Sequence, residues 1–425
     1  MRGVRLRRVW VVVALVMVAG GLSGCSLFVD SQLTTLMTQL GQDPAQAQRY
    51  FTSGATVSLP VIDESGHTTI AVNQQLKYVL TSRFSGIFTD QGEALGEALV
   101  AATTGLRDRA TAGETSARIA TQLFAILGSD QTIANHMPTG LKSRLAAILA
   151  DYMPDVIAAV EDRSVVLSDG YYWGNYFDSY PEGSMPYGGL ITLDEVKVLL
   201  GALGQGVNAD TNVQIVIAGW IPAETLSTDY LMKRFPVDLS GPVTLEASNR
   251  IGNVADFVAS DLASITSPVA RFAVKQPREL QPILQALDRV AAAAFLVPAS
   301  PDDWSPATWE QIRTEATHAI TSAASDPVVD PTASVSQLRN AIETRAGAII
   351  LDALLNSGGT SPAVLDGWTR PFPDGRTTIP PVVTQDGNGR YHADPAAPGF
   401  GAWRETNRGV PWYTITSAVQ DGLFW

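Results

Sequence analysis

The sequence predicts a mainly α-helical fold, a multi-helix domain with minor β-hairpins and a long aromatic-rich loop. Apolar residues recur every three or four positions over most of the chain, the spacing that places them on one face of a helix. Two capping boxes, Thr192-x-x-Glu195 and Ser334-x-x-Gln337, begin such stretches. Runs of β-branched residues flank turn-like segments near residues 56–72 and 382–393, and these predict the hairpins.

In the first half of the chain, four apolar stripes predict helices. Pro154 restricts the backbone of Met153, so we expect a kink or break at the end of the fourth. The predicted helices cover an N-terminal stripe ending at Gly41 (Leu33, Leu36, Met37, Leu40), Thr89–Thr104, Thr115–Leu127 and a stretch from Thr139 to Tyr152.

The second half contains five further helical stripes. The stretch around Val213–Trp220 is consistent with either a helix or a short buried strand, because periodicity does not separate the two over so few residues. The predicted helices cover 192–203, 243–262, 278–296, a stretch from Pro306 with Ser305 as N-cap and Trp304 and Trp309 as a hydrophobic staple, and 335–353.

The N-terminus has the features of a secretory leader. Four arginines precede an apolar run from Val9 to Gly21, which is short for a membrane span, and Leu22-Ser23-Gly24-Cys25 closes it. These four residues resemble the lipobox of bacterial lipoproteins, and Cys25 is the only cysteine of 425 residues. The alternatives are an uncleaved signal anchor or a leader cleaved elsewhere. We expect residues 9–21 to form a helix peripheral to the domain.

The resemblance to lipoproteins implies that Cys25 carries a diacylglyceryl thioether, often with an amide-linked fatty acid such as palmitate, and becomes the first mature residue. One acyl chain binds a bilayer only marginally, so stable anchoring needs more than one. The implied location is the extracytoplasmic face of the cell membrane. The membrane is then a partner of the protein, bound through the lipid on Cys25.

Composition indicates a globular, acidic protein. Hydrophobic residues make up 45% and charged residues 17% of the chain, whose net charge is −13. Without the four leader arginines, 25 basic and 42 acidic residues give a net charge of −17. This balance argues against nucleic acid as a partner and against electrostatic docking on anionic lipid. We divide the chain into a signal peptide (1–24), a helical domain (25–369) with an aromatic insertion (163–190), and an irregular C-terminal segment (370–425).

Two stretches in the middle of the chain resemble an uncharacterised family of actinobacterial domains. They are residues 95–105 (LGEALVAATTG) and the segment that runs from Met137-Pro138 and Leu141 through 145–156 (LAAILADYMPDV). The similarity extends from about Ser31 to Ser357. Such domains are helical and often occur in proteins with WXG-like, type VII secretion-associated or toxin-like architecture. This chain has no Trp-x-Gly tripeptide and no toxin module. The resemblance implies a helical fold and an envelope setting, and transfers no catalytic residue.

The sequence contains no motif that predicts catalysis or a cofactor. The four histidines are isolated, Gly-x-Ser-x-Gly is missing, and the 386–391 segment is better explained as a hairpin turn than as a calcium loop. We therefore expect no catalytic, cofactor-binding or metal site. The alternative is an envelope hydrolase that uses loop carboxylates such as Asp169, Asp178 and Glu182.

The aromatic insertion is the one candidate recognition surface. Tyr171, Tyr172, Trp173 and Tyr176 lie in a Gly- and Pro-rich stretch between helical stripes. One interpretation is a loop whose rings cap the helical core. The other is a binding surface for a protein partner of the cell envelope, because Tyr and Trp are enriched at binding hot spots. Together these observations predict a lipid-anchored, non-catalytic interaction protein.

Overall fold

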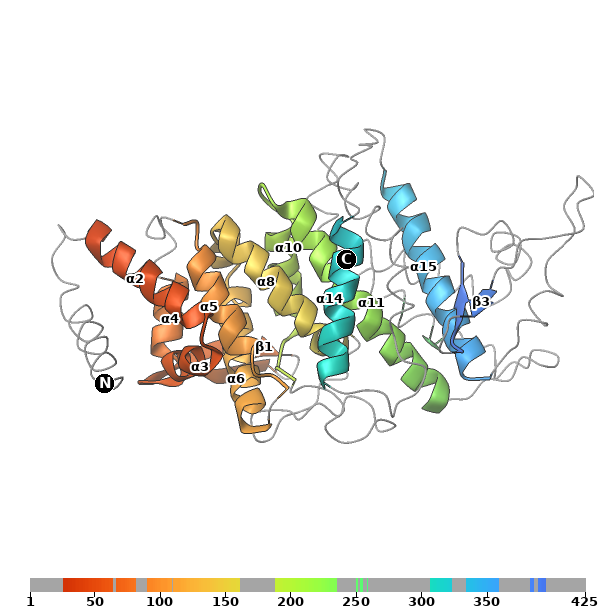
Figure 1. Ribbon diagram of the computed structural model, residues 1–425, viewed down its shortest axis with the longest axis horizontal. Coiled ribbons are helices and arrows are strands. Elements are labelled where there is room, and N and C mark those ends of the chain that lie inside the picture. Colours follow the sequence, from red (N-terminus) through yellow and green to blue (C-terminus); the bar gives the residue numbers. More distant parts are fainter. Residues whose placement is uncertain are drawn as a thin grey trace, which may run out of the picture.

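The computed structural model describes most of the N-terminal half of the chain and several C-terminal elements (Figure 1). The described residues are 26–63, 66–81, 90–108, 110–160, 188–234, 250, 253, 254, 258, 306–322, 334–358, 383–385 and 389–394. Within them lie twelve helices and two two-stranded sheets, so the predicted mainly α fold is confirmed.

The N-terminal part is a group of helices with one hairpin packed at its edge. Helix α2 packs on α5, and α3 contacts both α5 and α6. The hairpin predicted near residues 56–72 is present, and its strands pair with Thr56 opposite Asn73 and Asp63 opposite Gly66. The elements are α2 (Ser26–Gly41), α3 (Pro44–Thr52), β1 (Thr56–Asp63), β2 (Gly66–Asn73), α4 (Gln74–Thr81), α5 (Glu93–Thr103) and α6 (Ala110–Gly128).

The central helices complete the main core. The break predicted at Met153-Pro154 is present, and it separates α8 from α9. Helix α11 crosses α8 closely at Gly219, where a Cβ would lie 2.5 Å from the Ala150 carbonyl oxygen. These elements are α7 (Gln131–Asn135), α8 (Thr139–Asp151), α9 (Met153–Val160), α10 (Leu193–Leu203) and α11 (Ala209–Arg234).

The C-terminal elements lie beside α11 (Figure 1). Helix α14 (Pro306–Ser322) packs on α11 and α8, and α15 (Val335–Asn356) packs on α11 and on the second hairpin. That hairpin consists of β3 (Val383–Gln385) and β4 (Tyr391–Ala393), as predicted. One continuous core runs from Met37 in α2 to Leu354 in α15, and a small second cluster joins α15 to the hairpin.

Helix boundaries follow the polar caps. Helix α5 begins at Glu93, four residues after the predicted start, because the Asp90 carboxylate accepts from the Gly92 and Ala94 N–H groups. Helix α6 begins five residues before its predicted start at Thr115. Both predicted capping boxes are present. The stretch 213–220, which the sequence left open between a helix and a short buried strand, is helical.

Other predictions fall wholly or mostly outside the described residues. They include the leader helix 9–21, the helix 278–296 and most of the aromatic insertion. Of the predicted stripe 243–262, Val254 and Val258 are described, and both are helical and buried.

Candidate functional site

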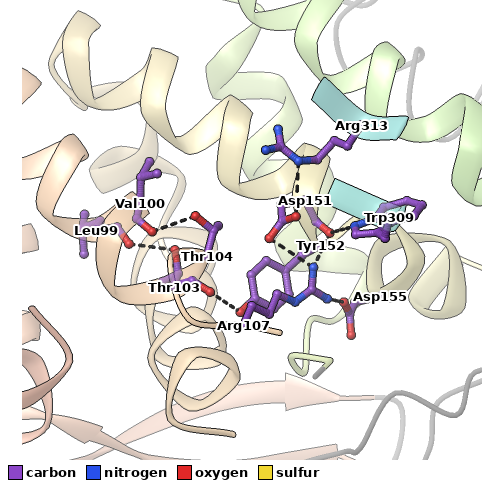
Figure 2. Close-up of polar contacts among 10 residues, drawn as sticks. All are labelled: Leu99, Val100, Thr103, Thr104, Arg107, Asp151, Tyr152, Asp155, Trp309 and Arg313. Carbon is purple, nitrogen blue, oxygen red and sulfur yellow. Dashed lines mark hydrogen bonds and ion pairs between the residues drawn. The ribbon is translucent and has the colours of Figure 1, made fainter. Parts of the chain in front are cut away.

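A buried group of charged residues lies where α8 ends and α9 begins (Figure 2). Arg107 enters it from the turn that follows α5. Its Nη1 donates to the backbone oxygen of Asp151 and lies 3.2 Å from Asp151 Oδ2, while its Nη2 donates to Asp155 Oδ2 at 3.1 Å. The three side chains are only 2–3% exposed. We call Arg107, Asp151, Asp155, Tyr152, Trp309 and Arg313 the Arg107 cluster.

The helix break creates the acceptor on which this cluster is built. In a continuous helix the Asp151 carbonyl would accept the Asp155 N–H. Here the Asp155 N–H bonds to the Tyr152 oxygen at 3.0 Å, and Pro154 has no N–H to offer. The Asp151 carbonyl oxygen accepts instead from Arg107 and, at 3.2 Å, from Trp309 Nε1. A buried carbonyl that the helix leaves unused is thus satisfied by side chains from two distant segments.

Helix α14 contributes the second cation of the cluster. Arg313 Nε lies 3.3 Å from Asp151 Oδ1, and Trp309, one turn earlier, is almost completely buried. Two guanidinium groups therefore face two carboxylates. Removing one partner of such a buried group leaves an uncompensated charge, so the cluster fixes α14 against the α8–α9 junction.

Tyr152 closes the cluster on the side of α5. Its hydroxyl donates to the Thr103 carbonyl oxygen at 2.7 Å, and the Arg107 guanidinium lies over its ring. Burial raises the pKa of the Tyr152 phenol well above its usual range, so the group stays a neutral donor. Arg107, Asp151 and Asp155 bond to one another almost without contact with solvent, and the Arg313 side chain is 15% exposed. We interpret the arrangement as structural rather than catalytic.

A second buried acid lies at the start of α10. Glu195 forms the predicted capping box, with the Thr192 N–H donating to its Oε2 at 2.9 Å. Gly128 at the end of α6 lies against this turn, and a Cβ there would come within 2.9 Å of Glu195 Cα. Burial raises the pKa of Glu195 to about 7, although the hydrogen bonds with Thr192 act in the opposite direction.

A third polar group attaches the second hairpin to α15. Asn356 pairs with the Tyr391 backbone through both side-chain atoms, donating to the carbonyl oxygen at 2.9 Å and accepting from the N–H at 2.8 Å. One turn earlier, Asp352 accepts from the Ala393 N–H and lies 3.3 Å from His392 Nδ1. Burial raises the pKa of Asp352, while hydrogen bonds from His392 and Ala393 lower it. Residues of α15 thus serve as hydrogen-bonding partners along β4.

The structure does not test the residues that the sequence singled out. Cys25, Tyr171, Tyr172, Trp173 and Tyr176 lie outside the described residues, as do the loop carboxylates Asp169, Asp178 and Glu182. The prediction that they bind lipid or a partner therefore stays a prediction.

The histidines are less isolated than the sequence suggests. His136 is the C-cap of α7, with its Nδ1 2.7 Å from the Thr132 carbonyl oxygen, and His318 is exposed on α14. His392 is buried beside Asp352, a pairing across 40 positions that no local pattern reveals. Within the described part of the chain, no group of three or more His, Cys, Asp or Glu residues is arranged to hold a metal ion.

Comparison with known proteins gives no further guidance, since no protein family, curated protein or solved structure matches this chain. None of the described helices is both long and apolar enough to cross a membrane.

Proposed function

We propose that this protein is a lipid-anchored, non-catalytic interaction protein on the extracytoplasmic face of the cell membrane. The observation that carries the proposal is the N-terminal sequence, in which a basic segment, a short apolar run and Leu22-Ser23-Gly24 precede the only cysteine. A lipid on Cys25 supplies the membrane attachment that a mature net charge of −17 does not favour.

The buried polar groups support a binding role over a catalytic one. The Arg107 and Asp352 side chains bond to neighbouring elements of the same chain, the Glu195 side chain bonds to the N-cap of its own helix, and each of the three residues is less than 10% exposed. Groups held in this way stabilise helix ends and junctions. A general acid or base must instead come within hydrogen-bonding reach of a substrate.

The aromatic insertion supplies the proposed surface for a protein partner of the cell envelope. Tyr171, Tyr172, Trp173 and Tyr176 are of the residue types that dominate binding hot spots. We assign them this role from the sequence.

The anchor is tested by replacing the lipid-bearing residue. Intact mass and labelled palmitate are measured for the wild-type protein, for Cys25→Ser and for the control Ser31→Ala. We expect the wild-type protein and the control to begin at Cys25 and to carry fatty acyl groups. Cys25→Ser should keep its leader and take up no label, while its far-ultraviolet circular dichroism should stay helical. Unlabelled wild-type protein that keeps its leader and stays in the membrane would contradict the proposal and indicate an uncleaved anchor.

A further inference from the structure

Helix α2 begins one residue after the proposed lipid attachment. Its first residue is Ser26, and it continues without a break to Gly41. No flexible linker therefore separates Cys25 from regular secondary structure.

The second half of α2 belongs to the core of the domain. Met37 and Leu40 are buried, Leu33 and Leu36 pack against the same core, and the helix contacts α5 and α3. At its end, a Cβ on Gly41 would lie 3.0 Å from Glu97 Cβ on α5, which shows how closely the two helices approach. The Asp43 N–H donates to the Leu40 carbonyl oxygen, and the Asp43 carboxylate caps α3. The second half of α2 is thus fixed to the domain, and the first half continues the same helix toward Cys25.

The distance from the anchor to the domain follows from helix geometry. Leu33 is seven residues after Ser26, and an α-helix rises 1.5 Å per residue, so the part of α2 before Leu33 spans about 10 Å. This is two turns, too short for appreciable bending. The described elements are arranged so that α2 begins at the outer edge of one end of the long axis, whereas α15 and β3 lie toward the other end (Figure 1).

We propose that α2 is a rigid stalk that fixes the orientation of the domain on the bilayer, with the α2 end near the lipid and the α15–β4 end away from it. This inference rests on the proposed lipid attachment at Cys25. It adds that the attachment sets direction as well as location, so the α15–β4 end faces away from the bilayer.

The test measures the height of two labels above a bilayer. Lipidation consumes the Cys25 thiol, so an introduced cysteine is the one free thiol for a fluorophore. Gln39→Cys places the label on α2 and Ser336→Cys places it at the start of α15, both at exposed positions. Each lipidated full-length mature protein is incorporated into phosphatidylcholine vesicles that carry acceptor lipid. Time-resolved energy transfer then gives the mean and the width of the distance distribution.

Two insertions after Ser31 separate a rigid stalk from a flexible tether. Seven helix-forming residues add about 10 Å and nearly two full turns, so the orientation of the domain is almost preserved. Seven Gly/Ser residues add the same chain length without stiffness. We expect narrow distributions in the unmodified stalk, with the Ser336 label farther from the bilayer than the Gln39 label. The helical insertion should shift both outward while keeping them narrow, and the Gly/Ser insertion should broaden both.

The outcomes distinguish this inference from the function on which it rests. Lack of fatty acid on the Cys25 peptide, measured by mass spectrometry, would overturn both. A lipidated protein whose two labels lie at equal heights, or whose distributions are already as broad as those of the Gly/Ser variant, would overturn the stalk alone.

Discussion

The guanidinium carbon of Arg107 lies 3.7 Å from the centre of the Tyr152 ring. The same ring packs edge-on against the Phe124 ring, with 5.7 Å between the ring centres. The Arg107 cation and two aromatic rings therefore meet inside the helical core. Cation–π contacts that exclude water contribute about 2 kcal/mol. Arg107 therefore combines two ion pairs, a bond to a helix-break carbonyl and a stacked ring.

Replacing Arg107 should strongly destabilise the protein. Arg107→Met leaves the Asp155 carboxylate buried without this ion pair, and breaking a buried ion pair in this way costs about 3–5 kcal/mol of unfolding free energy. The control is Arg118→Met, because Arg118 is 46% exposed and pairs with Glu114 on the same helix at 2.9 Å. That substitution should change the free energy of unfolding by no more than about 0.5 kcal/mol. Urea unfolding measures both, and equal losses would show that the Arg107 cluster contributes no more than a surface pair.

The raised pKa of Glu195 predicts a pH-dependent stability. A carboxyl group whose pKa is about 7 in the folded state and near its ordinary value when unfolded favours folding in its protonated form. This contribution is fully present below about pH 4.5 and is lost as the pH rises through 7. The difference between the two pKa values corresponds to about 3 kcal/mol.

The measurement is the free energy of unfolding at several pH values between 4.5 and 8.5. Glu195→Gln keeps an oxygen that can accept the Thr192 N–H but does not titrate, so its stability should fall less over this range than that of the wild-type protein. Glu315→Gln, at an exposed position on α14, is the matched control and should follow the wild-type curve. Parallel curves for all three proteins would contradict an elevated pKa at Glu195.

Asn356 should hold the second hairpin on α15. Asn356→Ala removes two hydrogen bonds to the Tyr391 backbone, so amide hydrogen exchange at 391–393 should accelerate by about tenfold or more, the equivalent of about 1.4 kcal/mol. Asn340→Ala, at an exposed position of the same helix, serves as the control and should leave those amides protected. Unchanged exchange in Asn356→Ala would show that other contacts hold β4.

The aromatic insertion is tested by the double variant Trp173→Ala, Tyr176→Ala. If these rings form the partner surface, the variant should lose more than about 2 kcal/mol of binding free energy, so envelope partners should no longer co-purify with it. Its melting temperature should be almost unchanged. If the rings belong to the core, the fold itself should lose roughly 3–5 kcal/mol and melt earlier. The double variant Tyr171→Phe, Tyr172→Phe, which keeps the rings, is the control.

Most helices could be predicted from the sequence because their signals are local. The capping boxes of α10 and α15 are four residues long, and the apolar stripe of α8 ends at a proline that marks the break. Helices α3, α4 and α7 are only five to nine residues long, so none presents a stripe long enough to identify. The predicted starts of α5 and α6 differ from the observed ones. The true starts depend on turn geometry, which the spacing of apolar residues does not record.

The Arg107 cluster could not be predicted from such signals. Pro154 predicts a backbone carbonyl near Asp151 that has no partner within the helix. The side chains that donate to this carbonyl lie 44 and 158 positions away in the chain. The His392–Asp352 pair likewise joins a strand to a helix across 40 positions. A pairing of this kind depends on how the helices cross, and no local pattern of the sequence encodes that.

The long separation between Asp151 and Trp309 has a consequence for how the chain acquires its structure. The helices up to α9 contain one half of the Arg107 cluster, and α14, with its second cation and its indole donor, is synthesised more than 140 residues later. Until then Asp151 lacks two of its partners, Trp309 and Arg313. Contacts this distant in sequence slow folding because the intervening loop must close before they form. The contacts at the junction between α8 and α9 are therefore complete only when α14 has packed against it.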